Sequence, residues 1–508
     1  MEFDIVLKNA KIYDGRGQEP YYSDIAIKDK KIAEIGSPGE LKAIKEIELT
    51  GKAICPGFID VHSHADLSIH KKNHNEILKP LICQGITTFV GGNCGIGLAP
   101  ISKSLSFEAL SYIEAMSGED QSPLINWYNF SGLLEELGKR GVVLNCALHA
   151  PHGLIRIAAK GLDNTVASSN EINNMKYLLE EALEAGAIGM STGLMYFPGL
   201  ASEENELIEL AKLLAAKDAV FASHIRSYSN TIFNAIDELI NISEKSGAKV
   251  QLSHLFRIPH INAFVDYLSS KLVKKLAQIN KYVKLPIPID QGIREVLVYL
   301  ENHIQKGIPI GIDAMPTGTG FTHILAFFPP WALEGGKEKI LNRISNKQSR
   351  NQILKSIQNG KSIWPHRGRN NWSMNYFKIM GFDSIFLMSV ITDKNKIYEG
   401  KNFVQIGKLR NQSPFDAICD MLIEEDGRVL IFESYTYPGD EFIERGVYAA
   451  IINQYVSVVT DTILIGLANQ ATCFMTAFQN FFLNMLKMKN YFQCKRQYEN
   501  LHHSLQVN

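Results

Sequence analysis

The chain has 508 residues, of which 45% are hydrophobic and 21% are charged, and its 52 Lys and Arg residues nearly balance its 53 Asp and Glu residues. This length is too great for one small domain, and the composition is that of a globular protein. The net charge of -1 excludes the basic excess that nucleic-acid and anionic-membrane partners require.

The N-terminus and the cysteines predict a cytoplasmic protein. Residues 1–5 lack the basic start and the apolar run of a signal peptide, and no apolar stretch is long enough to span a bilayer. The seven cysteines are scattered and odd in number, which is typical of reduced thiols inside a cell. We therefore expect no membrane partner, and free thiols of which one can serve as a ligand or nucleophile.

The first fifty residues predict a small β-sheet. Short apolar runs at residues 5–7, 11–13, 25–27 and 32–35 are joined by tight polar turns. Such closely spaced strands are typical of a small sheet and not of a βα unit. We assign residues 1–53 to the N-terminal part of a small β domain.

From Ala53 onward, apolar runs of strand length alternate with amphipathic segments of helical length, such as 170–185 and 203–216. Eight such strands are the number in a (β/α)8 barrel, which we predict over residues 54–465. The gap before the last strand is long and holds two more strand-like runs, 384–390 and 428–434, so the numbering of the last strand is open. The predicted strands are 54–61, 87–92, 142–149, 188–192, 219–224, 249–254, 308–313 and 455–461.

Metal-binding residue types stand where these strands end. In a barrel of parallel strands the carboxyl ends meet on one face, and residues i and i+2 of a strand point to the same side. His62 and His64 can therefore direct their rings at one ion. Imidazole, thiolate and carboxylate together are the ligand set of Zn²⁺. The strand-end candidates are His62, His64, Cys94, His224, His254 and Asp461.

Each candidate also has a structural interpretation. With 14 histidines, a His-x-His pair arises by chance roughly 0.4 times per chain, so His62-Ser63-His64 is weak evidence until its place at a strand end is considered. Cys94 can be a buried structural thiol, but the glycine-rich segment 91–95 lets backbone approach closely and favours a site. His224 and His254 can be core or surface histidines, and their matched strand-end positions favour ligation.

Four residues have candidate roles in proton transfer, substrate binding or the orientation of a ligand. Asp461 can cap a helix, but a carboxylate facing four candidate ligands is predicted to carry a proton. His152 can polarise a carbonyl or hold a loop. Tyr196 can hydrogen-bond an oxyanion or simply pack. Asp313, at the end of the seventh strand, can orient a ligand through a hydrogen bond or can satisfy the N–H groups of a neighbouring loop.

At these residues the sequence resembles the amidohydrolase superfamily and, within it, the N-acyl-D-amino-acid deacylases, or D-aminoacylases. The resemblance covers residues 1 to about 465, and cysteine on the second strand is its most specific sign. The segments that carry it are 56–66, 85–88, 91–95, 191–199, 223–226, 253–254, 433–435 and 460–461.

The resemblance implies a (β/α)8 barrel with a small β-sandwich built from both chain ends. It implies one tight zinc at Cys94, His224 and His254, and a second, weaker position at His62 and His64. It further implies that Asp461 is the catalytic acid/base and that Tyr196 contacts the substrate, as we also expect of His152.

The function that follows is zinc-dependent hydrolysis of the amide of an N-acyl-D-amino acid, a small-molecule substrate. Two alternatives stay open. One is a cyclic-amide hydrolase of the hydantoinase or dihydroorotase type, which uses the same metal chemistry. The other is a non-catalytic chain that keeps the barrel.

Three departures from the family pattern concern the substrate. Phe256 stands where a lysine is usual, Asp313 is followed by Ala-Met-Pro-Thr in place of Tyr-Pro-Tyr, and segment 469–474 lacks an expected arginine. The tail, residues 466–508, lacks the strand that closes the sandwich. The acyl group, the amino acid, its handedness and the oligomeric state therefore stay open.

Overall fold

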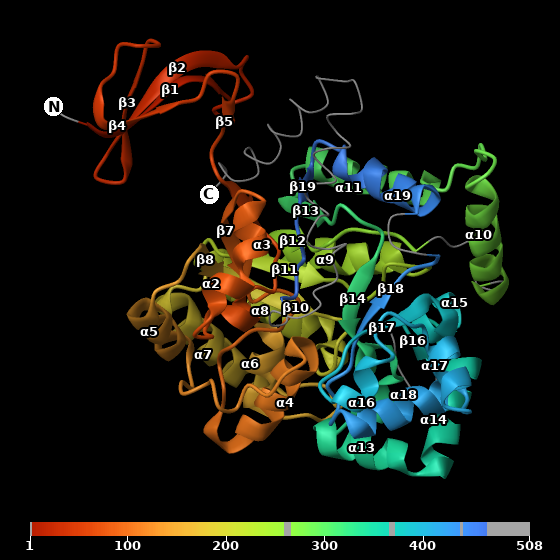
Figure 1. The fold of residues 1–508 in the computed structure, drawn as a ribbon. Coiled ribbons are helices and arrows are strands. Elements are labelled where there is room, and N and C mark those ends of the chain that lie inside the picture. Colours follow the sequence, from red (N-terminus) through yellow and green to blue (C-terminus); the bar gives the residue numbers. More distant parts are fainter. Residues whose placement is uncertain (1–2, 259–265, 365–370, 437–439, 465–508) are drawn as a thin grey trace. The chain divides into compact units, whose positions relative to one another are not determined.

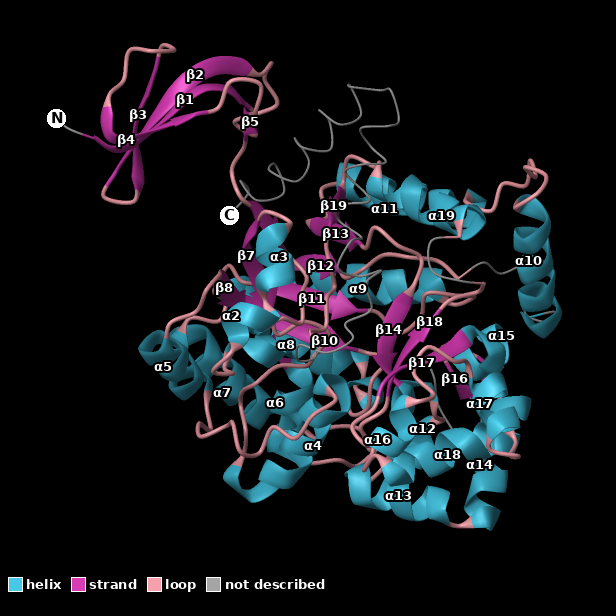
Figure 2. Cartoon of the chain, in the orientation of Figure 1, coloured by secondary structure: helices cyan, strands magenta, loops and turns pink. Residues whose placement is uncertain are grey.

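The computed structural model describes residues 3–258, 266–364, 371–436 and 440–464. These residues form two compact units, 3–59 and 60–464. Strands and helices alternate along the larger unit (Figure 1, Figure 2). The tail predicted at residues 466–508 lies outside the described residues. In the part of the chain that is described, no helix combines the length and the apolar character needed to cross a bilayer.

The first unit is a small sheet, as predicted. The strand order is β3-β2-β1-β4, with β5 beside β1, and Val6, Ala26 and Leu41 pack together as its core. Strand β2 is antiparallel to β1, whereas β4 is parallel to it. The described residues form this one sheet, so the second layer of the predicted sandwich is not shown. The strands are β1 (Phe3–Ile12), β2 (Tyr21–Lys28), β3 (Lys31–Gly36), β4 (Ala43–Glu48) and β5 (Ala53–Ile54).

Parallel strands follow one another in chain order through the second unit. Six form a sheet in the order β19-β13-β12-β11-β10-β9, and three form another in the order β6-β7-β8. Among the described residues, these parallel strands therefore form two separate sheets and not one closed ring. The strands are β6 (Phe58–Asp60), β7 (Ile86–Gly91), β8 (Asn145–Leu148), β9 (Ala150–Pro151), β10 (Gly189–Gly193), β11 (Val220–His224), β12 (Lys249–Leu252), β13 (Ile310–Ala314) and β19 (Val456–Val458).

Backbone hydrogen bonds join the edges of these two sheets. Strands β8 and β9 come from one run, whose first part pairs with β7 and whose second part pairs with β10. At the opposite edges, Asp461 N donates to His62 O at 2.9 Å, and His64 N donates to Thr462 O at 3.0 Å. The chain just after β19 is thereby fixed beside the chain just after β6.

The predicted first strand, 54–61, is wrong in its extent. It is two short strands, because β5 ends at Ile54 and β6 begins at Phe58. Pro56 lies between them and has no N–H to donate to a ladder, and Gly57 adds backbone freedom. The other predicted strands are present with small shifts of their ends.

The long gap after β13 holds a separate three-stranded antiparallel sheet, in the order β14-β18-β17. Its strands are β14 (Gly320–His323), β17 (Ile385–Ser389) and β18 (Leu430–Glu433). The two extra strand-like runs of the sequence are therefore β17 and β18. The last parallel strand is β19, which pairs with β13.

Most helices of the second unit lie between the strands along the chain. A pair of short strands, β15 (Lys361–Ser362) and β16 (Asn371–Trp372), and single-turn helices complete it. The helices are α1 (Asp66–Ile69), α2 (His74–Ile77), α3 (Lys79–Cys83), α4 (Ser106–Ser117), α5 (Phe130–Arg140), α6 (His152–Lys160), α7 (Ser169–Ala185), α8 (Glu204–Ala216), α9 (Ile232–Ser246), α10 (Asp266–Asn280), α11 (Gln291–Gln305), α12 (Pro330–Leu333), α13 (Gly336–Ser345), α14 (Lys347–Asn359), α15 (Tyr376–Met380), α16 (Asp393–Lys396), α17 (Phe403–Leu409), α18 (Pro414–Glu424) and α19 (Glu441–Ile451).

Helix α7 shows how local sequence sets these boundaries. The Ser168 side chain accepts from Glu171 N, and the Glu171 carboxylate accepts from Ser168 N, so two otherwise unpaired amides are satisfied. Buried apolar residues then recur at helical spacing on one face, including Met175 and Leu179. The helix ends at Gly186, whose φ of 121° suits glycine.

Replacing Ser168 by Ala is expected to lower the free energy of unfolding by about 1 kcal/mol, because the Glu171 amide loses its acceptor. The matched control is Ser169→Ala, an exposed serine one position further on. Urea unfolding followed by circular dichroism measures both. Equal effects of the two substitutions would show that the capping box does not stabilise α7.

Candidate metal centre

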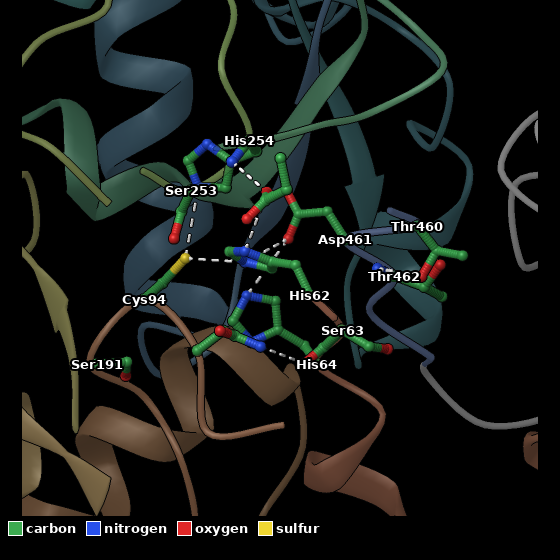
Figure 3. Close-up of polar contacts among 12 residues, drawn as sticks. His62, Ser63, His64, Cys94, Ser191, Ser253, His254, Thr460, Asp461 and Thr462 are labelled. Atoms are coloured by element: carbon green, nitrogen blue, oxygen red, sulfur yellow. Dashed lines mark hydrogen bonds and ion pairs between the residues drawn. The ribbon is translucent and has the colours of Figure 1, made fainter. Parts of the chain in front are cut away.

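The residues predicted as ligands lie at the carboxyl ends of the parallel strands. His62 and His64 follow β6, Cys94 follows β7, and His254 follows β12. Asp461 follows β19 and enters the same cluster from the other side (Figure 3). Each of these five residues is at most 8% exposed. Segments more than 390 residues apart in the sequence thus share one buried site.

His62 is at the middle of this cluster. Its Nε2 lies 3.4 Å from the Cys94 sulfur and 3.3 Å from Asp461 Oδ1 (Figure 3). His254 Nε2 lies 3.4 Å from the same sulfur, and His64 Nε2 lies 3.5 Å from Asp461 Oδ1. The potential ligand atoms therefore form two groups that share His62, and within each group the atoms lie within 4.8 Å of one another. The first group is His62, Cys94 and His254, and the second is His62, His64 and Asp461.

His224, at the end of β11, lies beside the first group. Its ring centroid is 4.5 Å from that of His254 and 4.7 Å from that of Tyr196. Both nitrogens of His224 are buried and have no hydrogen-bond partner among the described residues. An unpaired buried nitrogen is unfavourable unless another group satisfies it.

The residues of this cluster fit a metal ion in two respects. A thiol, imidazoles and a carboxylate are the ligands that zinc and related ions bind. Besides those of His224, the Nδ1 atoms of His64 and His254 are buried without a hydrogen-bond partner in the described residues. The cluster therefore offers more buried nitrogens than its described protein neighbours satisfy.

The backbone is strained at three of these residues. Cys94, His254 and Asp461 have φ values of 53°, 34° and 48°, in the left-handed region that residues with a Cβ rarely adopt. Such conformations cost about 1–3 kcal/mol each and persist where the surroundings enforce them, commonly at functional sites. Next to Cys94, Gly92 has a φ of 71°, and a Cβ there would lie 2.3 Å from His149 O.

Two buried aspartates contact the predicted ligands or the residue beside one of them. Asp313 Oδ1 accepts from His254 N and lies 3.5 Å from His62 Nδ1, while its Oδ2 accepts from Gln251 Nε2 at 2.6 Å. Asp60 accepts from the amide of Thr460 at 3.0 Å and from the Thr460 hydroxyl. Asp60 thereby fixes the turn that presents Asp461. Orientation of ligands by such outer groups is a general property of metal sites.

The role of Asp313 was anticipated as one of two possibilities, whereas Asp60 was missed. The sequence held a signal for Asp60, because Asp60 is two residues before His62 and alternate residues of an extended segment point to the same side. Its partner Thr460 comes from 400 residues further along the chain. Only the folded arrangement shows that the two side chains meet.

Burial and mutual charge set the protonation of the cluster. Burial lowers the pKa of His62, but the charges of Cys94, Asp461 and Asp313 outweigh it and hold that pKa well above its usual value. Burial raises the pKa of Asp461 to about 7 and that of Cys94 to about 11, and both shifts are opposed by His62. Burial lowers the pKa of His254 to about 3. A neutral imidazole is the form that binds a metal.

Of the two predicted substrate contacts, one lies beside the cluster. Tyr196 is buried next to His224, and its hydroxyl accepts from Thr322 Oγ1 at 3.2 Å. His152 begins α6 and is fully buried, with its Nε2 2.9 Å from Glu206 Oε1. Glu206 also accepts from Arg156 Nε at 3.1 Å. His152 thus takes part in a buried hydrogen-bonded group with Glu206 and Arg156, and its contact with substrate stays a prediction.

No family model matches the chain. Among curated proteins, it is 31% identical over 252 residues to the D-aminoacylase of Alcaligenes xylosoxydans xylosoxydans, covering 50% of each chain. It is 34% identical over 254 residues to the N-acyl-D-glutamate deacylase of the same organism, again covering 50% of each. The aligned part spans about half the length of these curated relatives.

Solved structures with this fold include the N-acyl-D-glutamate deacylase of Bordetella bronchiseptica in complex with zinc and a phosphonate inhibitor, a mimic of the tetrahedral intermediate. That structure has a TM-score of 0.69 and 20% identity, and the likeness covers 99% of this chain and 85% of that one. A D-aminoacylase described as defining a novel subset of amidohydrolases gives a TM-score of 0.62 at 21% identity, covering 91% and 76%.

Proposed function

We infer that this chain, a relative of the N-acyl-D-amino-acid deacylases of the amidohydrolase superfamily, is a zinc-dependent hydrolase that cleaves the amide bond of small N-acyl-D-amino acids. The observation that carries this inference is the buried cluster in which a thiol, imidazoles and a carboxylate converge at strand ends. The sequence relation to deacylases over half of the chain supports the reaction type.

Cys94, His224 and His254 would hold the tight metal position, and His62 and His64 the weaker one. This assignment is supported by the contacts of Cys94 with His62 and His254 and by the unpartnered nitrogens of His224. When bound, zinc supplies a Lewis acid that lowers the pKa of a water molecule and polarises an amide carbonyl.

Asp461 is the proton carrier in this proposal. Its Oδ1 lies within 3.5 Å of His62 and His64, so the carboxylate is directed into the cluster. It accepts a proton from the attacking water and donates it to the departing amine, which is a poor leaving group until it is protonated. The hydrogen bonds of Asp60 to Thr460 keep the carboxylate in place during both transfers.

Tyr196 is a substrate contact in this proposal. The ring is buried against His224, with 4.7 Å between the ring centroids, so Tyr196 lies beside the proposed tight metal position. A phenol donates a hydrogen bond and can stabilise the oxyanion that forms at the carbonyl carbon. Thr322 donates to the Tyr196 oxygen and leaves the phenol proton available for the substrate.

We also propose that the parallel strands form a (β/α)8 barrel. Their spatial order follows the chain order, as in such barrels. The hydrogen bond from Asp461 N to His62 O supports closure between the last strand and the first.

Incubation of the purified protein and Zn²⁺ with a panel of N-acyl-D-amino acids, their L enantiomers and hydantoin tests this function. Release of the free D-amino acid, measured by chromatography, is the expected result. Turnover of hydantoin alone would favour the cyclic-amide alternative. Absence of turnover of every amide would overturn the proposal.

A further inference from the structure

A cavity of about 340 Å³ lies beside the ends of β12 and β13. Its wall includes Leu255 and Phe256, which directly follow His254. The Phe256 ring is stacked on Tyr228 at 4.4 Å between centroids, and the Tyr228 ring lies 5.3 Å from His254. It also lies 5.1 Å from His224. One aromatic side chain thus connects the wall of the cavity to the metal centre.

The wall is mainly apolar and carries no unpaired positive charge among its described residues. The one Lys or Arg there is Arg257, whose Nη1 donates to Gly292 O at 2.7 Å and pairs with Glu295 at 3.2 Å. Burial of an anionic group in this cavity is therefore unfavourable, because the group would lose its hydration and would find no unpaired cation among the described residues. The apolar part of the wall includes Leu255, Phe256, Ile289, Met315, Ile443 and Val447.

Glu433, at the end of β18, is a buried carboxylate in this wall, whereas Glu295 is exposed. Glu433 is 8% exposed, and its Oε1 accepts from the Tyr376 hydroxyl at 2.6 Å. Its Oε2 is buried and has no hydrogen-bond partner among the described residues. Burial raises the pKa of this carboxyl to about 7, although the Tyr376 hydrogen bond opposes the shift. A buried acceptor without a partner is unfavourable until a donor reaches it.

The fold makes room for this carboxyl. Gly320 on β14 is the register partner of Glu433, and a Cβ at Gly320 would lie 2.5 Å from Glu433 Oε1. The opposite wall has free space at Gly446 on α19, where a Cβ would meet nothing within 4 Å. The glycine opposite Glu433 and the space at α19 leave both the carboxyl and the cavity open.

We propose that this cavity receives an uncharged, mainly apolar arm of the amide substrate, and that Glu433 selects arms that carry a hydrogen-bond donor. Suitable donors are a phenol, an indole N–H or a carboxamide. The proposal rests on the amide hydrolysis inferred above and deepens it by naming the substrate class. Glu433 acts on specificity and not on the reacting atoms, so an acidic arm such as that of glutamate is disfavoured.

The arm can belong to the amino acid or to the acyl group, and two substrate pairs distinguish these sources. N-acetyl-D-tyrosine and N-acetyl-D-phenylalanine differ by a donor on the amino acid. N-(4-hydroxyphenylacetyl)-D-alanine and N-phenylacetyl-D-alanine differ by the same donor on the acyl group. For the pair whose arm enters the cavity, we expect kcat/KM to be about 10-fold higher with the donor, since a hydrogen bond to a carboxylate is worth roughly that factor or more.

In Glu433→Gln, the amide oxygen keeps the Tyr376 hydrogen bond and the amide nitrogen faces the cavity, so the acceptor is lost. The 10-fold ratio is expected to fall to about 1. The matched control is Glu441→Gln, the same change at the exposed start of α19, which should keep the wild-type ratio. Equal ratios in wild type and Glu433→Gln for both pairs, or a preference for N-acetyl-D-glutamate, would overturn the proposal.

A second variant tests the cavity without changing Glu433. Gly446→Leu places a side chain in the free space and also favours the helix, so it should fold at least as well as the wild type. It is expected to lower kcat/KM for the aromatic substrate about 10-fold relative to N-acetyl-D-alanine. Gly138→Leu on α5, where a Cβ also meets nothing within 4 Å, is the control. An unchanged ratio in Gly446→Leu would place the substrate arm elsewhere.

Binding of p-cresol and toluene to the full chain separates the two proposals. Calorimetry is expected to show about 10-fold tighter binding of p-cresol, and loss of the difference in Glu433→Gln. If no amide is hydrolysed but this difference is found, the proposed function fails and the cavity assignment holds. If amides are hydrolysed and p-cresol binds no better than toluene, the assignment of Glu433 fails.

Discussion

Removal of metal with a chelator is expected to lower the unfolding temperature of this protein by several degrees, and added Zn²⁺ is expected to restore it. At free zinc about 1,000-fold above its dissociation constant, binding to the folded state alone contributes about 4 kcal/mol. Without metal, both buried ring nitrogens of His224 and the Nδ1 of His254 lack partners among the described residues. The strained turns at Cys94, His254 and Asp461 then also lack the compensation of ligand bonds. Differential scanning calorimetry measures the shift.

Cys94→Ala isolates the ligand role from general loss of packing. We expect the zinc content to fall by at least half and the zinc-dependent shift in unfolding temperature to disappear. The control is Cys419→Ala, because Cys419 is also a fully buried free cysteine but lies on α18, outside the cluster. That variant should lose some stability and keep its zinc. An unchanged zinc content in Cys94→Ala would remove Cys94 from the site.

The non-catalytic alternative predicts a different result in the thermal unfolding experiment. The unfolding temperature of a non-catalytic chain would respond neither to chelator nor to zinc, although its transition could still be cooperative. The thermal experiment therefore decides between the proposed hydrolase and the non-catalytic alternative before any substrate is known. The structure favours the first, because a buried cluster of imidazoles without a ligand is destabilising.

The strand ends could be predicted because their signal is local. An apolar run such as 219–224 finishes in His224, and parallel strands bring their carboxyl ends together whatever the exact geometry. The period of two residues along a strand then placed His62 and His64 on one side. Neither signal depends on which strands are neighbours.

The grouping of the ligands could not be predicted in the same way. The resemblance separated His62 from Cys94, whereas the structure places His62 Nε2 3.4 Å from the Cys94 sulfur. That contact depends on the left-handed turn at Cys94, which has a φ of 53°. Local sequence favours such a turn at glycine or asparagine, so nothing in the segment 91–95 assigns it to the cysteine.

The segment between β13 and β19 was the least predictable part of the fold. Strand-like runs at 384–390 and 428–434 have the same apolar character as the parallel strands. They form β17 and β18 instead, of which β18 pairs antiparallel with both β14 and β17, and this sheet supplies Glu433 to the cavity. Periodicity indicates that a run is a strand, but it does not indicate which partner it pairs with.

Asp461→Asn is expected to lower kcat by about 10²–10⁴-fold, the usual contribution of a positioned acid/base, while the protein keeps its tight zinc. Asn has the same shape and tolerates the left-handed φ of 48°, so the free energy of unfolding should change little. Asp461→Ala should lose the same activity and about 1 kcal/mol more stability, because Ala is disfavoured in that conformation.

The matched control for Asp461→Asn is Asp218→Asn. Asp218 also has a left-handed backbone, with a φ of 54°, but its side chain is 83% exposed and lies away from the cluster. It should keep full activity, measured as release of the D-amino acid by the zinc-loaded protein. If the kcat of Asp461→Asn lies within about 3-fold of the wild-type value at equal zinc content, Asp461 is not the proton carrier and another residue has that role. His64 would then be the first residue to test, since its Nε2 lies 3.5 Å from Asp461 Oδ1 and its Nδ1 has no hydrogen-bond partner among the described residues.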